Sequence, residues 1–296
     1  MAKKEKQPKK NVAVNEKHSQ WGDVWRRLCR NKLSVVGMII VLLLVLVGIF
    51  APLIAPYDPA EIDVVHRLEW PSAAHLLGTD NFGRDLLSRI IYGARISLGV
   101  AILALIFSTV FGIFIGGIAG FFGGWWDTII MRITDIIMAV PPILMCVSIN
   151  VVLGTGIIPT AIAVGFSGTP SVVRMMRGQV LTVRQQDYVE AAAMTGSSKM
   201  RILFRHILPN TLAPMIVDTS MRIGGNILGI SGLSFIGLGV QPPISEWGSI
   251  MTAGQEFIRT FWPLATFPGI AIALTLFGFN VFGDGLRDAL DPKLKD

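Results

Sequence analysis

The chain has 296 residues, of which 52% are hydrophobic and only 16% are charged, and its mean hydropathy is +0.58. Soluble domains contain about 25% charged residues, so this composition excludes an ordinary soluble protein and indicates an integral membrane protein. The apolar runs are long and uninterrupted, which predicts membrane-spanning helices rather than the alternating strands of a barrel. Ten of the 26 lysines and arginines precede residue 34, so the net charge of +6 points to contact with anionic membrane lipid and not with nucleic acid.

Residues 1–33 are predicted to form a cytoplasmic tail followed by an interfacial helix. The tail is polar and rich in lysine. Trp21, Trp25 and Leu28 then recur at helical spacing beside arginines, which is typical of an amphipathic helix on a membrane surface. A first membrane-spanning helix is expected at 34–56, because its uncharged part is long enough to cross about 30 Å of hydrocarbon.

Five further spans are predicted within residues 96–283. They are expected at about 96–126, 128–152, 157–173, 211–235 and 262–282. The second span has a glycine at every fourth position, a spacing that lets two helices approach closely; these are Gly112, Gly116, Gly120 and Gly124. The third span contains Pro141 and Pro142, which cannot both lie in an undisturbed helix, so a kink or break is expected there.

Basic residues in the connecting segments indicate the orientation of these spans. With the N-terminus in the cytoplasm, the tail, the insert between the fourth and fifth spans and the C-terminal tail at 284–296 carry ten, six and three of them. The two outer segments carry four, within 57–95, and one. The chain is therefore predicted to be an all-α integral membrane protein with six transmembrane helices and both termini in the cytoplasm.

The insert between the fourth and fifth spans, at 177–210, is the most charged part of this apolar region. Asp187 could cap a first short helix, with Glu190 three residues later in the spacing of a capping box. The three alanines at 191–193 favour a helix, and Gly196 is expected to end it.

A second short helix is expected at 199–207, capped by Ser197 or Ser198 and stopped before the membrane by Pro209. One face of this helix would be apolar, with Met200, Leu203, Phe204 and Ile207. A face of small side chains, a tight turn and an apolar face together suit insertion into a groove of a protein partner. The alternative is a loop that simply lies on the membrane surface.

Two ionisable residues, Asp218 and Arg222, are predicted to lie four residues apart on one face of the fifth span. Charged side chains at membrane depth usually face a cavity or a partner. They could line a translocation pathway, or they could form an ion pair within the helix near its cytoplasmic end.

The insert resembles a known family. The sequence EAA at Glu190, Ala191 and Ala192, followed by Gly196 and by Leu208-Pro209, is similar to the EAA loop of permease subunits in bacterial ABC importers. One position departs from the general pattern, since His206 stands where an isoleucine is usual. The form RHILPN is similar to the peptide and nickel branch of the family. The resemblance implies a loop that docks on cytoplasmic ATPase subunits through Asp187, Glu190, Ala191, Ala192, Gly196, Arg205, His206, Leu208 and Pro209.

A second resemblance lies on the predicted outer side. The stretch HLLGTDNFGRDLLSRIIYGARISL, from His75 to Leu98, looks like the entrance segment of dipeptide and oligopeptide permease "C" subunits. Glycines would supply its turns, and its acids and arginines could pair with one another. Such pairs could either hold the element together or contact substrate. The residues concerned are Gly78, Thr79, Asp80, Gly83, Arg84, Asp85, Ser88 and Arg89.

Together these resemblances imply the transmembrane domain of a type I ABC importer in a bacterial cytoplasmic membrane. The implied partners are a second, homologous permease subunit, two cytoplasmic ATPases and an external solute-binding protein. The chain has no GxxxxGK[ST] phosphate loop, so ATP and Mg²⁺ are expected on the partner ATPases, with no cofactor, metal or catalytic residue in this chain. Peptides are the expected substrate, and nickel is the alternative.

An enzyme of a different class must also be considered. Residues 165–168 read GFSG, the nucleophile pattern of rhomboid-like intramembrane serine proteases. Such chemistry requires a general base near the serine. None of the four histidines (His18, His66, His75 and His206) falls in a predicted span. A secondary transporter is a further alternative, but it would need an ion-coupling site and no docking loop.

Overall fold

The computed structural model describes residues 20–290, in which the regular elements are all helical apart from one isolated β-bridge between Thr79 and Asp85. The Lys-rich tail and the last six residues of the predicted C-terminal tail lie outside the described residues. The elements are α1 (Gln20–Arg30), α2 (Lys32–Ile49), α3 (Ala51–Ile54), η1 (Val64–His66), α4 (Leu86–Phe122), α5 (Gly124–Met138), α6 (Pro142–Leu153), α7 (Ile157–Arg184), α8 (Asp187–Met194), α9 (Lys199–Ile202), η2 (Leu203–Ile207), α10 (Leu208–Phe235), α11 (Trp247–Gln255) and α12 (Pro263–Leu290).

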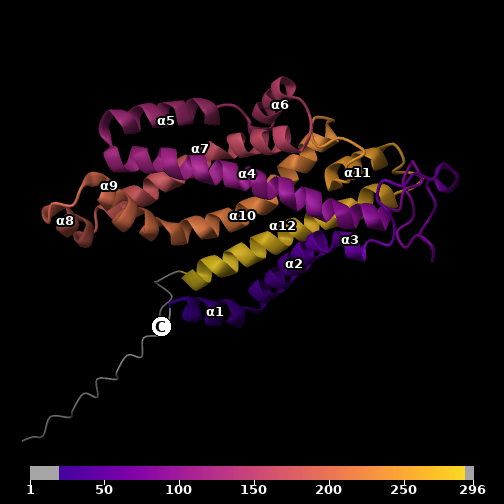
Figure 1. Ribbon diagram of the computed structural model, residues 1–296, viewed down its shortest axis with the longest axis horizontal. Coiled ribbons are helices and arrows are strands. Elements are labelled where there is room, and N and C mark those ends of the chain that lie inside the picture. Colours follow the sequence, from indigo (N-terminus) through magenta and orange to yellow (C-terminus); the bar gives the residue numbers. More distant parts are fainter. Residues whose placement is uncertain (1–19, 291–296) are drawn as a thin grey trace, which may run out of the picture.

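Five long helices, α2, α4, α7, α10 and α12, lie side by side along the long axis of the molecule (Figure 1). The short helices α8 and α9 lie at one end, and α11 lies at the other end with the loop that precedes α4. The amphipathic helix predicted near the N-terminus is α1, which packs on α12 and α2 and has Leu28 buried. The two ends of the bundle therefore carry the two segments that the sequence marks as functional.

Three helices, α2, α4 and α12, are each long and apolar enough to cross a membrane. The pair α5 and α6 meets the same criterion only as one broken span, bent by 90°. Helices α7 and α10 have 28 residues each, about 42 Å of helix, but they carry charged side chains. Six spans remain a prediction, since these criteria identify three or four among residues 20–290.

The break expected at Pro141 and Pro142 is confirmed. Helix α5 ends at Met138, Pro141 adopts an extended conformation with ψ of 134°, and α6 begins at Pro142. A proline at the first helical position is tolerated because its missing N–H group would have no partner there.

Two helices extend beyond the spans predicted within them, and both extensions have an electrostatic cause. Helix α4 begins at Leu86 and not near 96, because the Asp85 carboxylate caps it by accepting a hydrogen bond from Ser88 N at 2.7 Å. Helix α7 continues beyond residue 173 to Arg184. Its arginines do not interrupt it, since Arg174 and Arg177 form ion pairs with α5.

Helices α4 and α7 are in close contact through the glycines of α4. A Cβ atom at Gly112 would lie within 3.0 Å of the Val172 side chain, and one at Gly116 within 3.0 Å of the Val173 carbonyl oxygen. Gly120 meets Arg177 in the same way, so helix packing is confirmed for these three. Gly124 is an exception, because it begins α5 and nothing lies within 4 Å of its Cβ position.

Candidate functional site

Helices α8 and α9 form the predicted pair of short helices between α7 and α10. Gly196 lies just after the end of α8 and has φ of +78°, a conformation that favours glycine. No atom lies within 4 Å of its Cβ position, so backbone conformation, and not lack of space, requires glycine here. Ser198 caps α9 by accepting a hydrogen bond from Arg201 N at 3.4 Å. The expected turn and second cap are thus confirmed.

The cap proposed for the first helix is wrong. Asp187 is the first residue of α8, and the cap position is Gln186, whose side chain makes no capping bond. Only two residues separate α7 from α8, and the Gln186 carbonyl accepts from Val189 N at 2.9 Å. Asp187 and Glu190 instead occupy the first turn, where negative charge is favourable to the helix dipole.

Pro209 does not stop the second helix, contrary to the prediction. It lies in the first turn of α10, which continues directly from η2, a π-helical turn. Proline cannot donate a hydrogen bond to the carbonyl four residues earlier, and a π turn is one way to accommodate that loss. The His206 carbonyl accepts from Asn210 Nδ2 at 2.7 Å and from the Tyr188 hydroxyl at 3.4 Å, so side chains of α10 and α8 meet at this turn.

The apolar face predicted for residues 199–207 is divided between the interior and the surface. Leu203 and Ile207 are buried in a cluster with side chains of α7 and α8. Met200 and Phe204 point outward and are 53% and 52% exposed. The exposed apolar side chains of this end define a surface that we call the coupling face: Tyr188, Met194, Met200 and Phe204.

The other predicted coupling residues surround this face or support it. Ala192, His206 and Leu208 are half-buried. Asp187, Glu190, Ala191, Gly196, Arg205 and Pro209 are exposed. The α8–η2 segment therefore presents acids on α8 and an arginine on η2 beside an apolar face, an arrangement suited to contact with a protein.

The predicted entrance segment forms a compact element at the opposite end, centred on Asp80. Its carboxylate accepts hydrogen bonds from Arg84 Nε at 2.7 Å, from Arg84 N at 3.0 Å and from Phe82 N at 2.7 Å. Arg89, on the first turn of α4, donates a further bond to it. All three charged side chains are buried, so they stabilise the fold of the element and present no charge to solvent.

The remaining residues of this segment fix its backbone. Gly78 and Gly83 have φ of +83° and +78°, and a Cβ atom at either would overlap a backbone carbonyl, as their turn role predicts. Thr79 donates to the His66 carbonyl, and its hydroxyl accepts from Glu69 N at 2.9 Å.

Asp85 and Ser88 tie the start of α4 to the preceding loop. Besides capping α4, Asp85 contacts His75 Nδ1 at 3.0 Å, and Ser88 Oγ accepts from Tyr57 N at 3.1 Å. An outward pocket of about 130 Å³ lies here, lined by Tyr57, Asp58, Glu61, Asp63, His75, Gly83 and Asp85.

At the exposed edge of this element, Asp63 hydrogen-bonds His66. This bond raises the pKa of His66 and lowers the pKa of Asp63.

Sequence reasoning missed the polar core under α11, where it expected only a loop. Glu246 is fully buried and caps α11 by accepting from Gly248 N and Ser249 N at 2.9 and 2.8 Å. Ser97 of α4 donates to the same carboxylate at 3.2 Å. Trp247 is buried and donates from Nε1 to the Ile90 carbonyl at 2.9 Å. An acidic cap before a helix start was the available signal.

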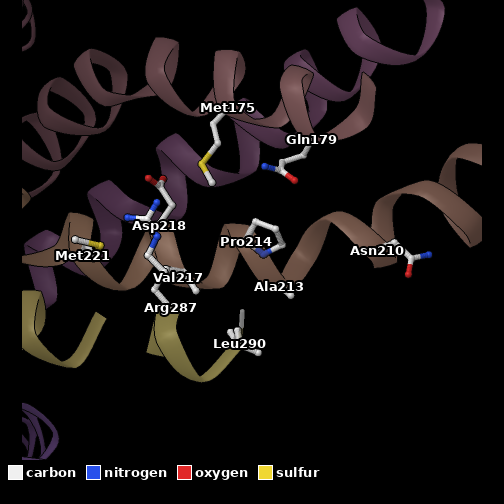
Figure 2. Close-up of a pocket in the computed structure, with 10 residues that line it drawn as sticks. All are labelled: Met175, Gln179, Asn210, Ala213, Pro214, Val217, Asp218, Met221, Arg287 and Leu290. Carbon is white, nitrogen blue, oxygen red and sulfur yellow. The ribbon is translucent and has the colours of Figure 1, made fainter. Parts of the chain in front are cut away.

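Asp218 and Arg222 form an ion pair within α10, as one of the two interpretations of these residues expected. Asp218 also lines a pocket of about 520 Å³ between α7, α10 and α12. Figure 2 shows Met175 and Gln179 entering it from α7 and Arg287 pointing from α12 toward Asp218. Asn210, close to the coupling face, lines the same pocket.

The serine of the GFSG sequence lies within α7. Ser167 donates its hydroxyl hydrogen bond to the Val164 carbonyl at 3.0 Å, and its near polar neighbour is the Cys146 thiol at 3.4 Å. The histidines of the described chain lie at the two ends of the bundle and not in α7. This geometry is that of a helix-packing serine and gives the protease interpretation no support.

Two known protein families match this chain, one over its N-terminal part and one over a longer C-terminal part that includes the coupling face. Residues 112–296 match the family described as "Binding-protein-dependent transport system inner membrane component". Residues 19–71 match "N-terminal TM domain of oligopeptide transport permease C". The first match includes the coupling face and covers more than half of the chain.

Curated relatives are similar over nearly the whole length. The chain is 43% identical over 277 residues to the dipeptide transport system permease protein DppC of Alkalihalophilus pseudofirmus, covering 94% of this chain and 91% of that one. It is 42% identical over 285 residues to the glutathione transport system permease protein GsiD of Escherichia coli, covering 96% and 94%.

A solved structure shares the fold at low sequence identity. It is the MetNI methionine ABC transporter in inward-facing conformations, with a TM-score of 0.56 and 16% identity, over 69% of this chain and 97% of that one. From these matches, the chain belongs to the family of binding-protein-dependent transport system inner membrane components and is a permease subunit of an ABC importer.

Proposed function

We propose that this chain is a transmembrane subunit of an ATP-driven importer that moves short peptides into a bacterial cytoplasm. The observation that carries the proposal is the similarity, above 40% identity and over more than 90% of the chain, to permeases named for dipeptide and glutathione transport. Both named substrates are small peptides. Nickel import is the alternative, and neither of these two relatives is named for it.

The coupling face is the proposed contact with two cytoplasmic ATPase subunits, which would bind ATP and Mg²⁺. Four apolar side chains are exposed there on short helices with Asp187, Glu190 and Arg205 beside them. Apolar anchors surrounded by charged groups suit a protein interface in water better than they suit lipid. ATP-driven closure of the ATPases would move this segment and, through it, α7 and α10.

The opposite end is the proposed contact with an external solute-binding protein. Its buried ion pairs give a rigid platform, and the acidic residues around the outer pocket supply surface charge. Between the two ends we propose six spans with both termini in the cytoplasm, formed by α2, α4, the bent pair α5–α6, α7, α10 and α12. A second, homologous permease subunit would complete the pathway, on which Asp218 and Arg222 would lie.

The experiment is purification of the tagged chain from its native cells in mild detergent, together with uptake assays. The proposal expects ATPase subunits and a second permease to copurify, and uptake of labelled di- or tripeptides to be lost on deletion of the gene and restored by the wild-type chain. Copurification should be lost when Gly196 or Glu190 is replaced. Normal peptide uptake in the deletion strain, or no ATPase bound to the wild-type chain, would contradict the proposal.

A further inference from the structure

The pocket between α7, α10 and α12 combines fixed charges of both signs with amide and thioether side chains. Asp218 and Arg287 are its charged residues, Gln179 and Asn210 its amides, and Met175 and Met221 its thioethers. A volume of about 520 Å³ is within the range of pockets that enclose small organic ligands, roughly 300–1,000 Å³. The ligand that fits such a lining is small and carries both a cationic and an anionic group.

The Asp218 carboxylate has capacity for a cation beyond its ion pair. One oxygen, Oδ2, accepts from Arg222 Nε, while Oδ1 accepts no hydrogen bond from the groups that the structure describes. The side chain is 27% exposed, and it lines the pocket. Arg222 itself is not among the lining residues, so it holds Asp218 in place from outside the pocket.

Arg287 supplies the opposite charge from a different helix. None of the ion pairs among the side chains that the structure describes includes Arg287, and Figure 2 shows its side chain pointing from α12 into the pocket toward Asp218. A guanidinium group binds a carboxylate through two parallel hydrogen bonds, which makes it well suited to a terminal carboxylate.

We propose that this pocket binds the free termini of a short peptide, with Asp218 receiving the N-terminal ammonium group and Arg287 the C-terminal carboxylate. The proposal rests on the proposed peptide import and names a site for it in this subunit. Its position between the coupling face and the centre of the bundle makes it the last site that a peptide occupies before release to the cytoplasm. The thioethers of Met175 and Met221 can adapt to side chains of different shape, which allows peptides of varied sequence.

The test is equilibrium binding of radiolabelled trialanine to the purified transporter in nanodiscs, without nucleotide and without solute-binding protein. Three forms of the peptide are compared: free termini, N-acetylated and C-amidated. With the wild-type chain, blocking either terminus is expected to weaken binding about tenfold, the effect of losing one charge-assisted hydrogen bond.

Each variant should remove sensitivity to one terminus only. In Asp218→Asn, N-acetylation no longer weakens binding while C-amidation still does, and Arg287→Gln shows the reverse.

Arg222→Gln keeps both sensitivities, because Arg222 lies outside the pocket. Two control variants remove one charge each from exposed positions outside the pocket: Asp284→Asn removes a negative charge and Arg201→Gln a positive one. Both should bind the three peptides as the wild type does. Size-exclusion profiles confirm that each variant is folded.

Two results would overturn this site. In the first, the wild-type chain binds no peptide, or binds the blocked peptides as tightly as the free one. In the second, the Asp218 and Arg287 variants discriminate between the three peptides as the wild type does. If the same transporter copurifies with ATPases and imports peptide in proteoliposomes supplied with solute-binding protein and ATP, only the site is wrong. If it does neither, the proposed function fails as well.

Discussion

Arg89 donates a hydrogen bond to the carboxylate of Asp80, nine residues earlier, and both side chains are almost completely buried. One acid thus serves two buried arginines, since Arg84 binds the same carboxylate. This shared carboxylate joins the loop before α4 to the helix itself.

Asp80→Ala should destabilise the outer end of the molecule. Removing the shared acid leaves two buried guanidinium groups without a counter-charge, a loss of about 3–5 kcal/mol for a broken buried pair. We expect a lower unfolding temperature in detergent and faster protease cleavage within residues 57–85. Glu61→Gln removes an exposed charge from the same loop and should behave like the wild type. Equal stability of the two variants would show that the pairing has no structural role.

Gly116→Ala should disturb the packing of α4 on α7. The added methyl group would lie within 3.0 Å of the Val173 carbonyl, which cannot move without shifting α7. Overpacking of this kind costs about 1–3 kcal/mol. Gly178→Ala is the control, because nothing lies within 4 Å of its Cβ position on α7. Thermal unfolding should separate the two variants, with Gly178→Ala unchanged or more stable.

Phe204→Ala and Leu203→Ala should have opposite phenotypes, although the residues are neighbours. Phe204 is half-exposed on the coupling face, so its removal should leave the unfolding temperature unchanged and reduce ATPase copurification. Leu203 is buried, and its truncation should lower the free energy of unfolding by about 2–5 kcal/mol. If Phe204→Ala bound ATPases normally, the coupling face would not be the docking surface.

Arg222→Ala should reduce peptide uptake and leave assembly intact. The substitution frees Asp218 from its partner on α10, and loss of a partly exposed ion pair is worth about 1 kcal/mol, or roughly fivefold in rate. Uptake is measured in proteoliposomes of the reconstituted transporter, with copurification as the measure of assembly. Arg222→Lys keeps the charge and should recover part of the activity. Unchanged uptake in Arg222→Ala would place this ion pair outside the transport cycle.

Rules that apply to single residues predicted the turns at glycines and the helix break at the two prolines. Gly78, Gly83 and Gly196 adopt positive φ where turns were expected, and Pro141 with Pro142 separates α5 from α6. Features that depend on distant partners could not be predicted in this way. Helix α7 tolerates Arg177 because Asp127 of α5 binds it, and Glu246 is buried because Ser97 of α4 and the amides of α11 satisfy its carboxylate.

The position of Pro209 shows the same limit. Its missing N–H group was expected to end a helix, but the π turn of η2 carries the chain through into α10. A rule based on one residue cannot anticipate this compensation.

The continuity of η2 with α10 also makes the two sides of the α8–η2 segment mechanically unequal. On one side, helical backbone is continuous from Lys199 into α10, so a displacement of Phe204 would pass directly into the first turns of α10, as far as Pro214 inside that helix. On the other side, α8 is joined to α9 by the turn at Gly196 and to α7 by Gln185 and Gln186, and the buried Val189 packs it against both neighbours. Movement of the coupling face would therefore reach α10 through continuous helix, whereas it would reach α7 only through α8 and two turns.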